Sequence, residues 1–503
     1  MSYTAPVKDI AFALNHVVKI DEIAALPGFE DATPDLVDAI LDESAKFTQE
    51  VLSPLNRVGD EQGSQWSEQG VKTPDGWQDA YKQFCENGWN SLAFPQEYGG
   101  QGLPMCVSAA VQEMWHATNM SFGLCPLLTQ GAVDAIEHHA SDELKQIYLP
   151  NMVDGKWSGT MNLTEPQAGT DLAAIRTRAE PSGDHYLISG QKIYITYGEH
   201  DLTENIVHLV LARLPDAPPG VKGISLFIVP KFMVNDDGSV GERNDVRCIS
   251  IEHKLGIHAS PTCVMSYGDN GGAVGYLVGK EHHGLAYMFT MMNQARHAVG
   301  VEGYSIAEGA YQQARGYALE RKQGKTLLGQ SEDDQAIVNH PDVRRILMTM
   351  RANIEAMRAL GLECAAAFDR ARNHADEETR SYHQRRGELL TPLVKGWSTE
   401  NGVELCSLGI QVHGGMGFIE ETGAAQYLRD ARITPIYEGT TAIQANDLIG
   451  RKTARDGGQG MSELLADIEA TQQELEKSNQ PDLQIIANQL GEAVAAAKEA
   501  TEW

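Results

Sequence analysis

A single carboxylate, Glu438, lies in the stretch ITPIYEGTTAIQ (residues 433–444), between an apolar run of β type and the expected first turn of a helix. Thr441 and Gln444 have the spacing of a capping box, in which Thr441 caps the helix and Gln444 reaches back to it. An acid beside a helix N-terminus is stabilised by about 0.3–1 kcal/mol, which gives Glu438 a plain structural interpretation. The alternative is a general base, and this stretch alone leaves both interpretations open.

Three further features could take part in chemistry. MNLTEPQAGTD (161–171) carries small and hydroxyl residues whose free backbone N–H groups can cradle a phosphate or a flavin edge, although such loops are usually plain connectors. QVHGGMGF (411–418) has glycines suited to close backbone approach by a ligand, and equally to a tight turn. Arg296 and Arg321 share one helical pattern, where arginines are usually solvated surface charges.

The composition is that of an ordinary globular protein of 503 residues, 42% hydrophobic and 22% charged. Its net charge of −29 opposes binding to nucleic acid or to an anionic membrane. No run of about 18 apolar residues occurs, which argues against a transmembrane helix. The N-terminus MSYTAPVKDIAFAL lacks the basic start and apolar core of a signal peptide, so we expect a cytoplasmic protein.

Cysteine and histidine usage gives no sign of a metal site. The seven cysteines are scattered without a CxxC pair, and the sixteen histidines show no spacing typical of zinc ligands. We therefore expect buried thiols in a reducing compartment and no bound metal.

The hydrophobic period changes twice along the chain. It is helical from about residue 34, changes to a period of two in HYLISGQKIYIT, NIVHLVLARL, GISLFIVPKF and TCVMSYGD, and becomes helical again from about residue 284. This order predicts the α+β class. The expected domains are an N-terminal helical domain (1–158), an antiparallel β-domain (159–282), a C-terminal helical bundle (283–455) and a helical appendage (456–503).

Together and in this order, LTEPQAGTD, GQKIYIT, the helix from ARHAVGVEG to ERKQGK, QVHGGMGF and IYEGTTAIQ closely resemble the acyl-CoA dehydrogenase family of flavoproteins. The resemblance covers about residues 35–450. The opening YTAPVKDIAFAL and the phrase MMNQAR are most similar to a larger bacterial branch of that family. Members of the branch usually continue into a longer helical C-terminal domain, so this chain looks shortened beside them.

The resemblance implies an FAD-dependent enzyme that converts an acyl-CoA thioester to the trans-2-enoyl-CoA. The branch suggests 3-methylthiopropanoyl-CoA or a short- to medium-chain fatty acyl-CoA as the substrate. It implies electron-transferring flavoprotein as the electron acceptor and an assembly of at least two chains. An acyl-CoA oxidase, which passes electrons to oxygen, stays open. A flavin-bearing DNA-binding relative is a further alternative, which the acidic tail SELLADIEATQQELEKSNQPD disfavours.

In this family the glutamate of YEGT removes the α-proton, which makes Glu438 the implied catalytic base. Some relatives carry their base just before the helical arginine, where this chain has Ala295, which cannot accept a proton. A base needs a raised pKa, so burial must outweigh the nearby helix dipole, which favours the ionised form.

The remaining site residues are also carried over from the family. Leu163 and Thr164 are expected to meet the flavin ring, and Tyr194 with Thr196 to cover its other side. Met161 and Tyr194 depart from the aromatic residue and the tryptophan of many relatives, and Asn293 departs from an aspartate. The implied cofactor-binding set is Met161, Leu163, Thr164, Gly169, Thr170, Tyr194, Thr196, Arg321, Gln411, Gly414, Gly415 and Thr440. The implied substrate-binding set is Thr170, Asn293, Arg296 and Glu438.

Arg296 and Arg321 are 25 residues apart, so they lie about 37 Å apart on one helix. One end of that helix can serve the local substrate, but the other end cannot. The resemblance implies that Arg321, Gln411 and Gly415 reach the pyrophosphate and adenosine side of a neighbouring chain's flavin, where a guanidinium suits a pyrophosphate better than an ammonium does.

Overall fold

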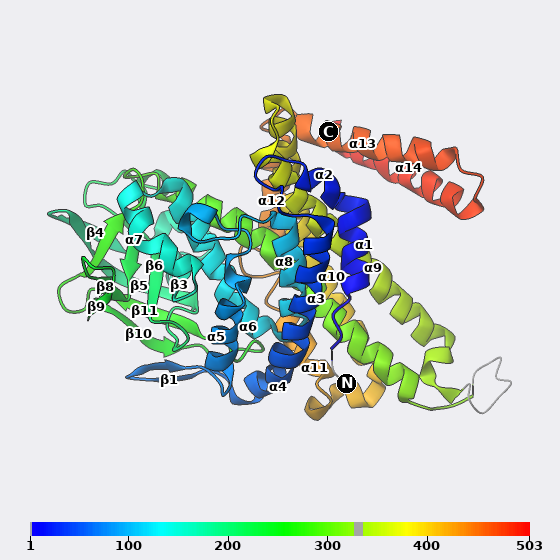
Figure 1. Cartoon of the computed structure of the whole chain (residues 1–503), viewed down its shortest axis with the longest axis horizontal. Helices are drawn as coiled ribbons and strands as arrows, with labels where there is room; N and C mark the ends of the chain where they lie inside the picture. Colours follow the sequence, from blue (N-terminus) through cyan, green and yellow to red (C-terminus); the bar gives the residue numbers. More distant parts are fainter. Residues whose placement is uncertain (1–2, 326–334, 503) are drawn as a thin grey trace.

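The computed structural model describes residues 3–325 and 335–502 (Figure 1). Helices come first, a β-sheet follows, and helices return, which confirms the predicted α+β class. In Figure 1 the sheet lies at one side of a helical body, and a pair of helices at the C-terminal end projects from the other side.

The N-terminal part is helical because its apolar residues recur at intervals of three and four. Its first long helix follows Thr33, whose hydroxyl accepts the N–H of Leu36 at 3.4 Å, and has Pro34 at its first position. The elements are α1 (Val7–Ala13), α2 (Ile20–Ala24), α3 (Pro34–Phe47), α4 (Ser53–Gln62), β1 (Gln65–Ser67), β2 (Gly70–Lys72), α5 (Trp77–Glu86), α6 (Met105–His139) and α7 (Asp142–Val153).

α6 consists of two helices joined by a kink at Asn119, where φ is −155° and ψ is 83°. The side-chain oxygen of Asn119 accepts the N–H of Phe122 at 3.1 Å, as an N-cap does, and so begins the second half. The kink lets the halves face each other: Gln112 donates to Gln130 at 2.9 Å.

The main sheet has the strand order β10-β11-β5-β12-β7-β6-β3, and β4 pairs with β5 and β6. The sequence runs with a period of two correspond to β5, β6, β7 and β11, as expected. The strands are β3 (Trp157–Asn162), β4 (Arg178–Ser182), β5 (His185–Thr196), β6 (Asn205–Arg213), β7 (Ile224–Pro230), β8 (Phe232–Val234), β9 (Val240–Arg243), β10 (Val246–Ile251), β11 (Thr262–Tyr267) and β12 (Ala273–Leu277).

The β-domain is not wholly antiparallel, which corrects the expectation from the sequence. β3 runs parallel to β6, with Trp157 opposite Asn205, and β4 makes one parallel pair with β6. The chain between β3 and β6 makes a long excursion through β4 and β5, and such a crossover is what lets two strands of one sheet point the same way.

The C-terminal bundle is built on three long helices. Its elements are α8 (Gly284–Glu320), α9 (Pro341–Asn373), α10 (Glu377–His413), α11 (Ala424–Ala431) and α12 (Thr441–Asp447). α8 packs against α6, α9 and α10, and α1 also contacts α9. Glycines let α8 and α10 approach closely: a Cβ on Gly303 would lie 2.6 Å from the carbonyl oxygen of Ser398, and one on Gly402 would lie 2.4 Å from that of Gly303.

The C-terminal hairpin is formed by α13 (Gln459–Glu476) and α14 (Pro481–Glu502), which pack on each other. α13 meets α10 through ion pairs of 2.6 Å, Arg385 with Glu463 and Arg386 with Asp467. α13 and α14 run alongside each other in the projecting pair (Figure 1). In the part of the chain that the structure describes, no helix has the length and apolar character needed to cross a membrane.

A buried charge cluster joins the two helical parts. The guanidinium of Arg358 on α9 donates to both carboxylate oxygens of Glu113 on α6, with the shortest contact at 2.6 Å, and to Glu308 on α8 at 3.2 Å. All three side chains are at most 1% exposed. Because the carboxylates would be uncompensated without Arg358, this residue ties α6, α8 and α9 together.

We predict that Arg358→Ala lowers the free energy of unfolding by about 3–5 kcal/mol, because it leaves two buried carboxylates without a cation. Chemical denaturation measures this loss. The control is Arg345→Ala on the same helix, whose ion pair with Asp342 is exposed and should contribute about 0–1 kcal/mol. Equal effects of the two substitutions would contradict the prediction.

Candidate active site

Glu438 has a left-handed backbone, with φ at 53°, which is uncommon for a residue other than glycine. Gly439, which follows it, also has a positive φ, at 90°. Such a conformation at a non-glycine residue costs about 1–3 kcal/mol and persists only where the surroundings fix it. The contacts around Glu438 therefore show what holds it.

The predicted capping box is wrong. Thr440 rather than Thr441 is the N-cap of α12, and its side chain makes no capping hydrogen bond. The hydroxyl of Thr441 donates instead to a glutamate of α10. Gln444 does reach back, but its amide donates to the carbonyl oxygens of Glu438 at 3.2 Å and Gly439 at 3.1 Å. Gln444 therefore holds the strained turn and does not cap the helix.

Two buried cations hold the same turn. Arg296 of α8, only 3% exposed, directs its Nε to the carbonyl oxygen of Glu438 at 3.4 Å and pairs with Asp447 at 3.1 Å. Lys395 of α10 donates to the carbonyl oxygen of Gly439 at 2.7 Å. Arg296 is thus not a solvated helical arginine, and sequence reasoning gave no role to Lys395 or Asp447.

The carboxyl group of Glu438 has the properties expected of a base. Burial raises its pKa, while Arg296 and Lys395 act in the opposite direction. Desolvation is thus the largest influence, as the sequence argument required. Among the described residues, no acceptor takes the backbone N–H of Glu438, so this donor is free to bind an oxygen of a ligand.

The loop after β3 is fixed by a buried ion pair. Lys192 of β5 donates to Glu165 at 2.9 Å and to the carbonyl oxygen of Leu163 at 2.9 Å. Burial would raise the pKa of Glu165, but Lys192 and the donors of Thr177 and Arg176 lower it to about 2. The sequence gave no sign of this pair, which sets the position of Leu163.

The loop and β5 come together where the sequence predicted a flavin site. The N–H of Ile193 donates to the carbonyl oxygen of Thr164 at 2.9 Å, next to Tyr194. Tyr194 has a positive φ of 60°, and 61% of the residue is exposed. Leu163, Thr164 and Thr196 are half-buried, Met161 is buried on β3, and Gly169 and Thr170 are exposed. An exposed aromatic ring beside apolar and hydroxyl groups fits a planar flavin ring.

The residues expected at the pyrophosphate lie away from Glu438. Arg321 is the C-cap of α8 and is exposed, as are Gln411, Gly414 and Gly415 at the end of α10. These two helix ends lie side by side, since the rings of Tyr317 and His413 are 4.6 Å apart. Arg296 lies in the first half of α8, 25 residues before Arg321, so the chain forms two separate clusters.

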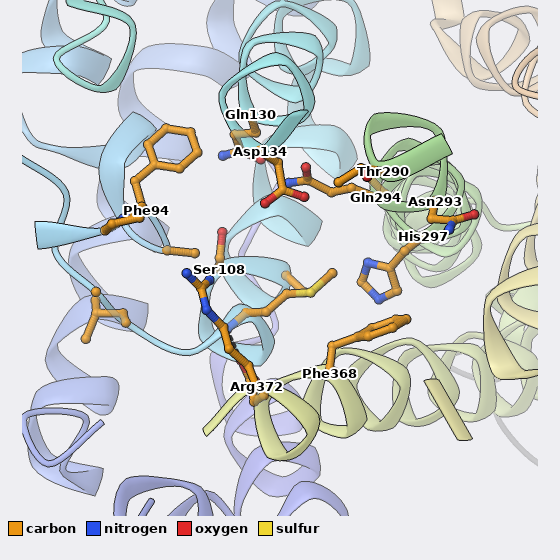
Figure 2. Close-up of a pocket in the computed structure, with 18 of the residues that line it drawn as sticks. Phe94, Ser108, Gln130, Asp134, Thr290, Asn293, Gln294, His297, Phe368 and Arg372 are labelled. Atoms are coloured by element: carbon orange, nitrogen blue, oxygen red, sulfur yellow. Dashed lines mark hydrogen bonds between the residues drawn. The ribbon is translucent and has the colours of Figure 1, made fainter. Parts of the chain in front are cut away.

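A cavity of about 710 Å³ lies between the halves of α6, the first part of α8 and the end of α9. Asn293 and Ala295 line it, three residues and one residue before Arg296. Apolar side chains make up more of the wall than polar ones, and Figure 2 shows Arg372 extending toward Ser108. Burial raises the pKa of Asp134 in the same wall. The resemblance assigns Asn293 to the substrate, and the structure places it in the wall of this cavity.

Three protein-family models match most of the chain. The acyl-CoA dehydrogenase N-terminal domain matches residues 36–156, the middle domain 160–269 and the C-terminal domain 282–452. The chain belongs to the acyl-CoA dehydrogenase family, whose members are FAD-dependent flavoprotein oxidoreductases.

The relatives give a finer comparison. 3-Methylmercaptopropionyl-CoA dehydrogenase of Ruegeria pomeroyi is 53% identical over 497 residues, which are 99% of this chain and 84% of the relative. Butyryl-CoA dehydrogenase of Syntrophomonas wolfei is 37% identical over 93% of this chain and 78% of the relative. The solved structure of Caenorhabditis elegans ACDH-11 in complex with C11-CoA shares the fold, with a TM-score of 0.79 at 20% identity over 99% of this chain and 83% of that one.

We predict that Lys192→Met lowers the free energy of unfolding by about 3–5 kcal/mol at pH 7, because it strands a buried carboxylate. The pKa of Glu165 is depressed, so its contribution to stability is present above the unfolded value of about 4.3 and is lost as the pH falls through the folded value. Without Lys192 the pKa of Glu165 rises, so Glu165 takes up a proton at a higher pH than in the wild type. The loss should therefore be smaller at about pH 4 than at pH 7.

Chemical denaturation at both pH values measures this difference. The control is Lys156→Met, whose ion pair with Asp154 is exposed and should contribute about 0–1 kcal/mol at either pH. A loss of stability that is the same at both pH values would argue against the ion pair as its cause.

Proposed function

We propose that this chain oxidises an acyl-CoA thioester to the trans-2-enoyl-CoA, with Glu438 as the catalytic base and FAD as the cofactor. The observation that supports it best is the half-buried carboxyl of Glu438, whose pKa burial raises and which is held on a strained turn with a free N–H. A base and a donor for the developing negative charge thus belong to one residue.

In the proposed reaction, the carboxylate of Glu438 takes the α-proton of the thioester. Its backbone N–H donates to the thioester carbonyl oxygen as enolate charge develops there. FAD, when bound, supplies the acceptor for the β-hydrogen, which leaves as hydride. Arg296 and Lys395 hold the carbonyl oxygens of the turn, so the carboxyl can change its protonation state while the backbone stays in place.

We assign the flavin ring to the residues of the loop after β3 and of β5, and treat the pyrophosphate end of the flavin separately below. The ring would lie against Leu163, Thr164, Thr170, Tyr194 and Thr196, with Met161, Gly169 and Thr440 nearby. Tyr194 supports this assignment because its side chain is exposed and its backbone strained, as expected where a ligand is gripped.

The substrate we favour is 3-methylthiopropanoyl-CoA or a short- to medium-chain acyl-CoA. Support comes from the Ruegeria pomeroyi relative, which is 53% identical. Asn293, half-buried on α8, would lie along the CoA chain.

We propose electron-transferring flavoprotein as the electron acceptor, on the basis of the family. An oxidase would instead release hydrogen peroxide in air. Hydrogen peroxide assayed with reduced enzyme and no added acceptor separates the two: none is expected for the dehydrogenase.

We further propose a homodimer or larger assembly, in which Arg321, Gln411, Gly414 and Gly415 reach a neighbour's flavin. Support comes from the distance between these residues and Glu438 along α8. It also comes from Phe418, a large apolar side chain beside them that is 86% exposed.

We predict that Glu438→Gln retains flavin but loses about 10² to 10⁴ in the rate of flavin reduction, which is the usual contribution of a general base. Bleaching of flavin absorbance by 3-methylthiopropanoyl-CoA, butanoyl-CoA and octanoyl-CoA measures it. The control is Glu421→Gln, an exposed carboxylate outside the site. Near-normal reduction by Glu438→Gln would refute the assignment, and bleaching of the wild type by no thioester would refute the function.

We predict that Arg321→Ala weakens flavin retention although Arg321 lies far from Glu438, because a phosphate partner is removed. Flavin content after gel filtration measures this, and Lys82→Ala, an exposed cation of α5, serves as the control. Light scattering of the flavin-loaded wild type should give at least a dimer. A monomer with full flavin occupancy would reject the shared site.

A further inference from the structure

A second carboxyl group, Glu302, is buried beside the base. It lies on α8, six residues after Arg296, and none of its surface is exposed. One oxygen, Oε2, accepts a hydrogen bond from the hydroxyl of Tyr437. The other, Oε1, has no partner within the described part of the chain. A buried carboxyl that lacks a cation and has one unpaired oxygen is best accommodated as the neutral acid.

The charges around Glu302 agree with this. The pKa of Glu302 is raised to about 8, chiefly by burial and in smaller part by the charge of Glu438, against the effects of Tyr437 and Lys395. Lys395 lies on α10 but donates to the carbonyl oxygen of Gly439, and it forms no ion pair within 4.0 Å among the described residues. Burial lowers the pKa of Lys395 to about 8. Glu302 and Glu438 thus share a site that favours one negative charge over two.

The bond to Tyr437 connects Glu302 to the base. Tyr437 immediately precedes Glu438, whose positive φ has to be held from outside. Arg296 and Lys395 hold the carbonyl oxygens of residues 438 and 439, on the far side of the Glu438 α-carbon. Glu302 holds Tyr437, the residue on the N-terminal side of Glu438, so the strained residue is held on both sides along the chain.

Other charges on α8 have different partners. Glu308, six residues further along, belongs to the cluster of Arg358 from α9 and Glu113 from α6. Arg296 is paired with Asp447 of α12. Glu302 is the buried carboxyl of α8 whose partner is a hydroxyl group rather than a cation.

We propose that Glu302 is a positioning residue for the base: through Tyr437 it fixes the backbone that carries Glu438, and its own charge state controls whether the site can accept more negative charge. This rests on the proposed function of Glu438. Glu302 touches neither substrate nor flavin in this proposal and acts through its neighbour.

The proposal has a definite dependence on pH. Below about pH 8 Glu302 is neutral and does not oppose enolate charge. Above that value it ionises beside Glu438, and two like charges disfavour a third on the thioester. Flavin reduction should therefore slow as the pH rises through about 8. Because Lys395 also loses its proton near this pH, the two groups have to be separated by substitution.

The test uses the flavin-loaded protein and a thioester that bleaches the wild type. Glu302→Gln keeps an acceptor for Tyr437 but cannot ionise, so the alkaline decline should disappear. Lys395→Arg keeps a cation at high pH and should leave the decline in place. Tyr437→Phe removes the link and should lower the rate about 10- to 100-fold at every pH, as a displaced base does.

Thermal unfolding gives a readout that does not depend on activity. The folded pKa of Glu302 lies above its unfolded value of about 4.3, so the folded protein keeps a proton that the unfolded chain loses, and stability falls as the pH rises between the two. The melting temperature of the wild type should thus drop more between about pH 5.5 and 8 than that of Glu302→Gln.

The outcomes separate cleanly. An alkaline decline that survives in Glu302→Gln but vanishes in Lys395→Arg assigns the effect to the lysine and overturns the proposal. Equal pH dependence of the melting temperature in Glu302→Gln and the wild type also overturns it. Failure of every thioester to bleach the wild type instead rejects the proposed function, and the melting data still test the charge state of Glu302.

Discussion

Charge removed from water needs an opposite charge or a proton, and α8 meets this requirement in three ways along one helix. Arg296 is paired with Asp447, and Glu308 shares Arg358 with a carboxylate of α6. Glu302 has a hydroxyl partner and a raised pKa. The ion pairs connect helices, and the third arrangement leaves a group near the reaction centre that can change its charge.

The same constraint shapes the turn at Glu438. Both nearby cations bond to backbone carbonyl oxygens rather than to the carboxylate. A direct ion pair would lower the pKa of the carboxyl and make it a weaker base. Held from the backbone side, the turn keeps its strained shape while the carboxyl stays free to gain and lose a proton. The close contact of α8 and α10 at their glycines makes this possible, because it brings Arg296 and Lys395 to one turn.

The sequence predicted the elements better than their partners. A period of two marked β5 and β6, and helical spacing marked the return of helices from about residue 284, because these signals are local. The parallel pairing of β3 with β6 was not foreseen, since direction is decided by a crossover and not by the strand itself. The capping box failed for a related reason: Gln444 had the correct spacing, but carbonyl oxygens of the turn lay closer to its amide.

The residues of the candidate site also differ in how far the sequence could predict them. Glu438 and Tyr194 belong to contiguous motifs, and the structure adds strain and exposure that the motifs could not reveal. Glu302 and Lys395 stand in ordinary helical runs, and only the fold brings them to residues 135 and 44 positions away along the chain. Contacts of this kind have no local signature.

The C-terminal hairpin is attached differently from the rest of the molecule. It meets α10 through Arg385 and Arg386, whose carboxylate partners on α13 retain exposure to water. Mobile ions reach such pairs and weaken them over about 8 Å at physiological salt, whereas the buried pairs of α8 are shielded. Ionic strength therefore affects the docking of the hairpin more than it affects the surroundings of Glu438.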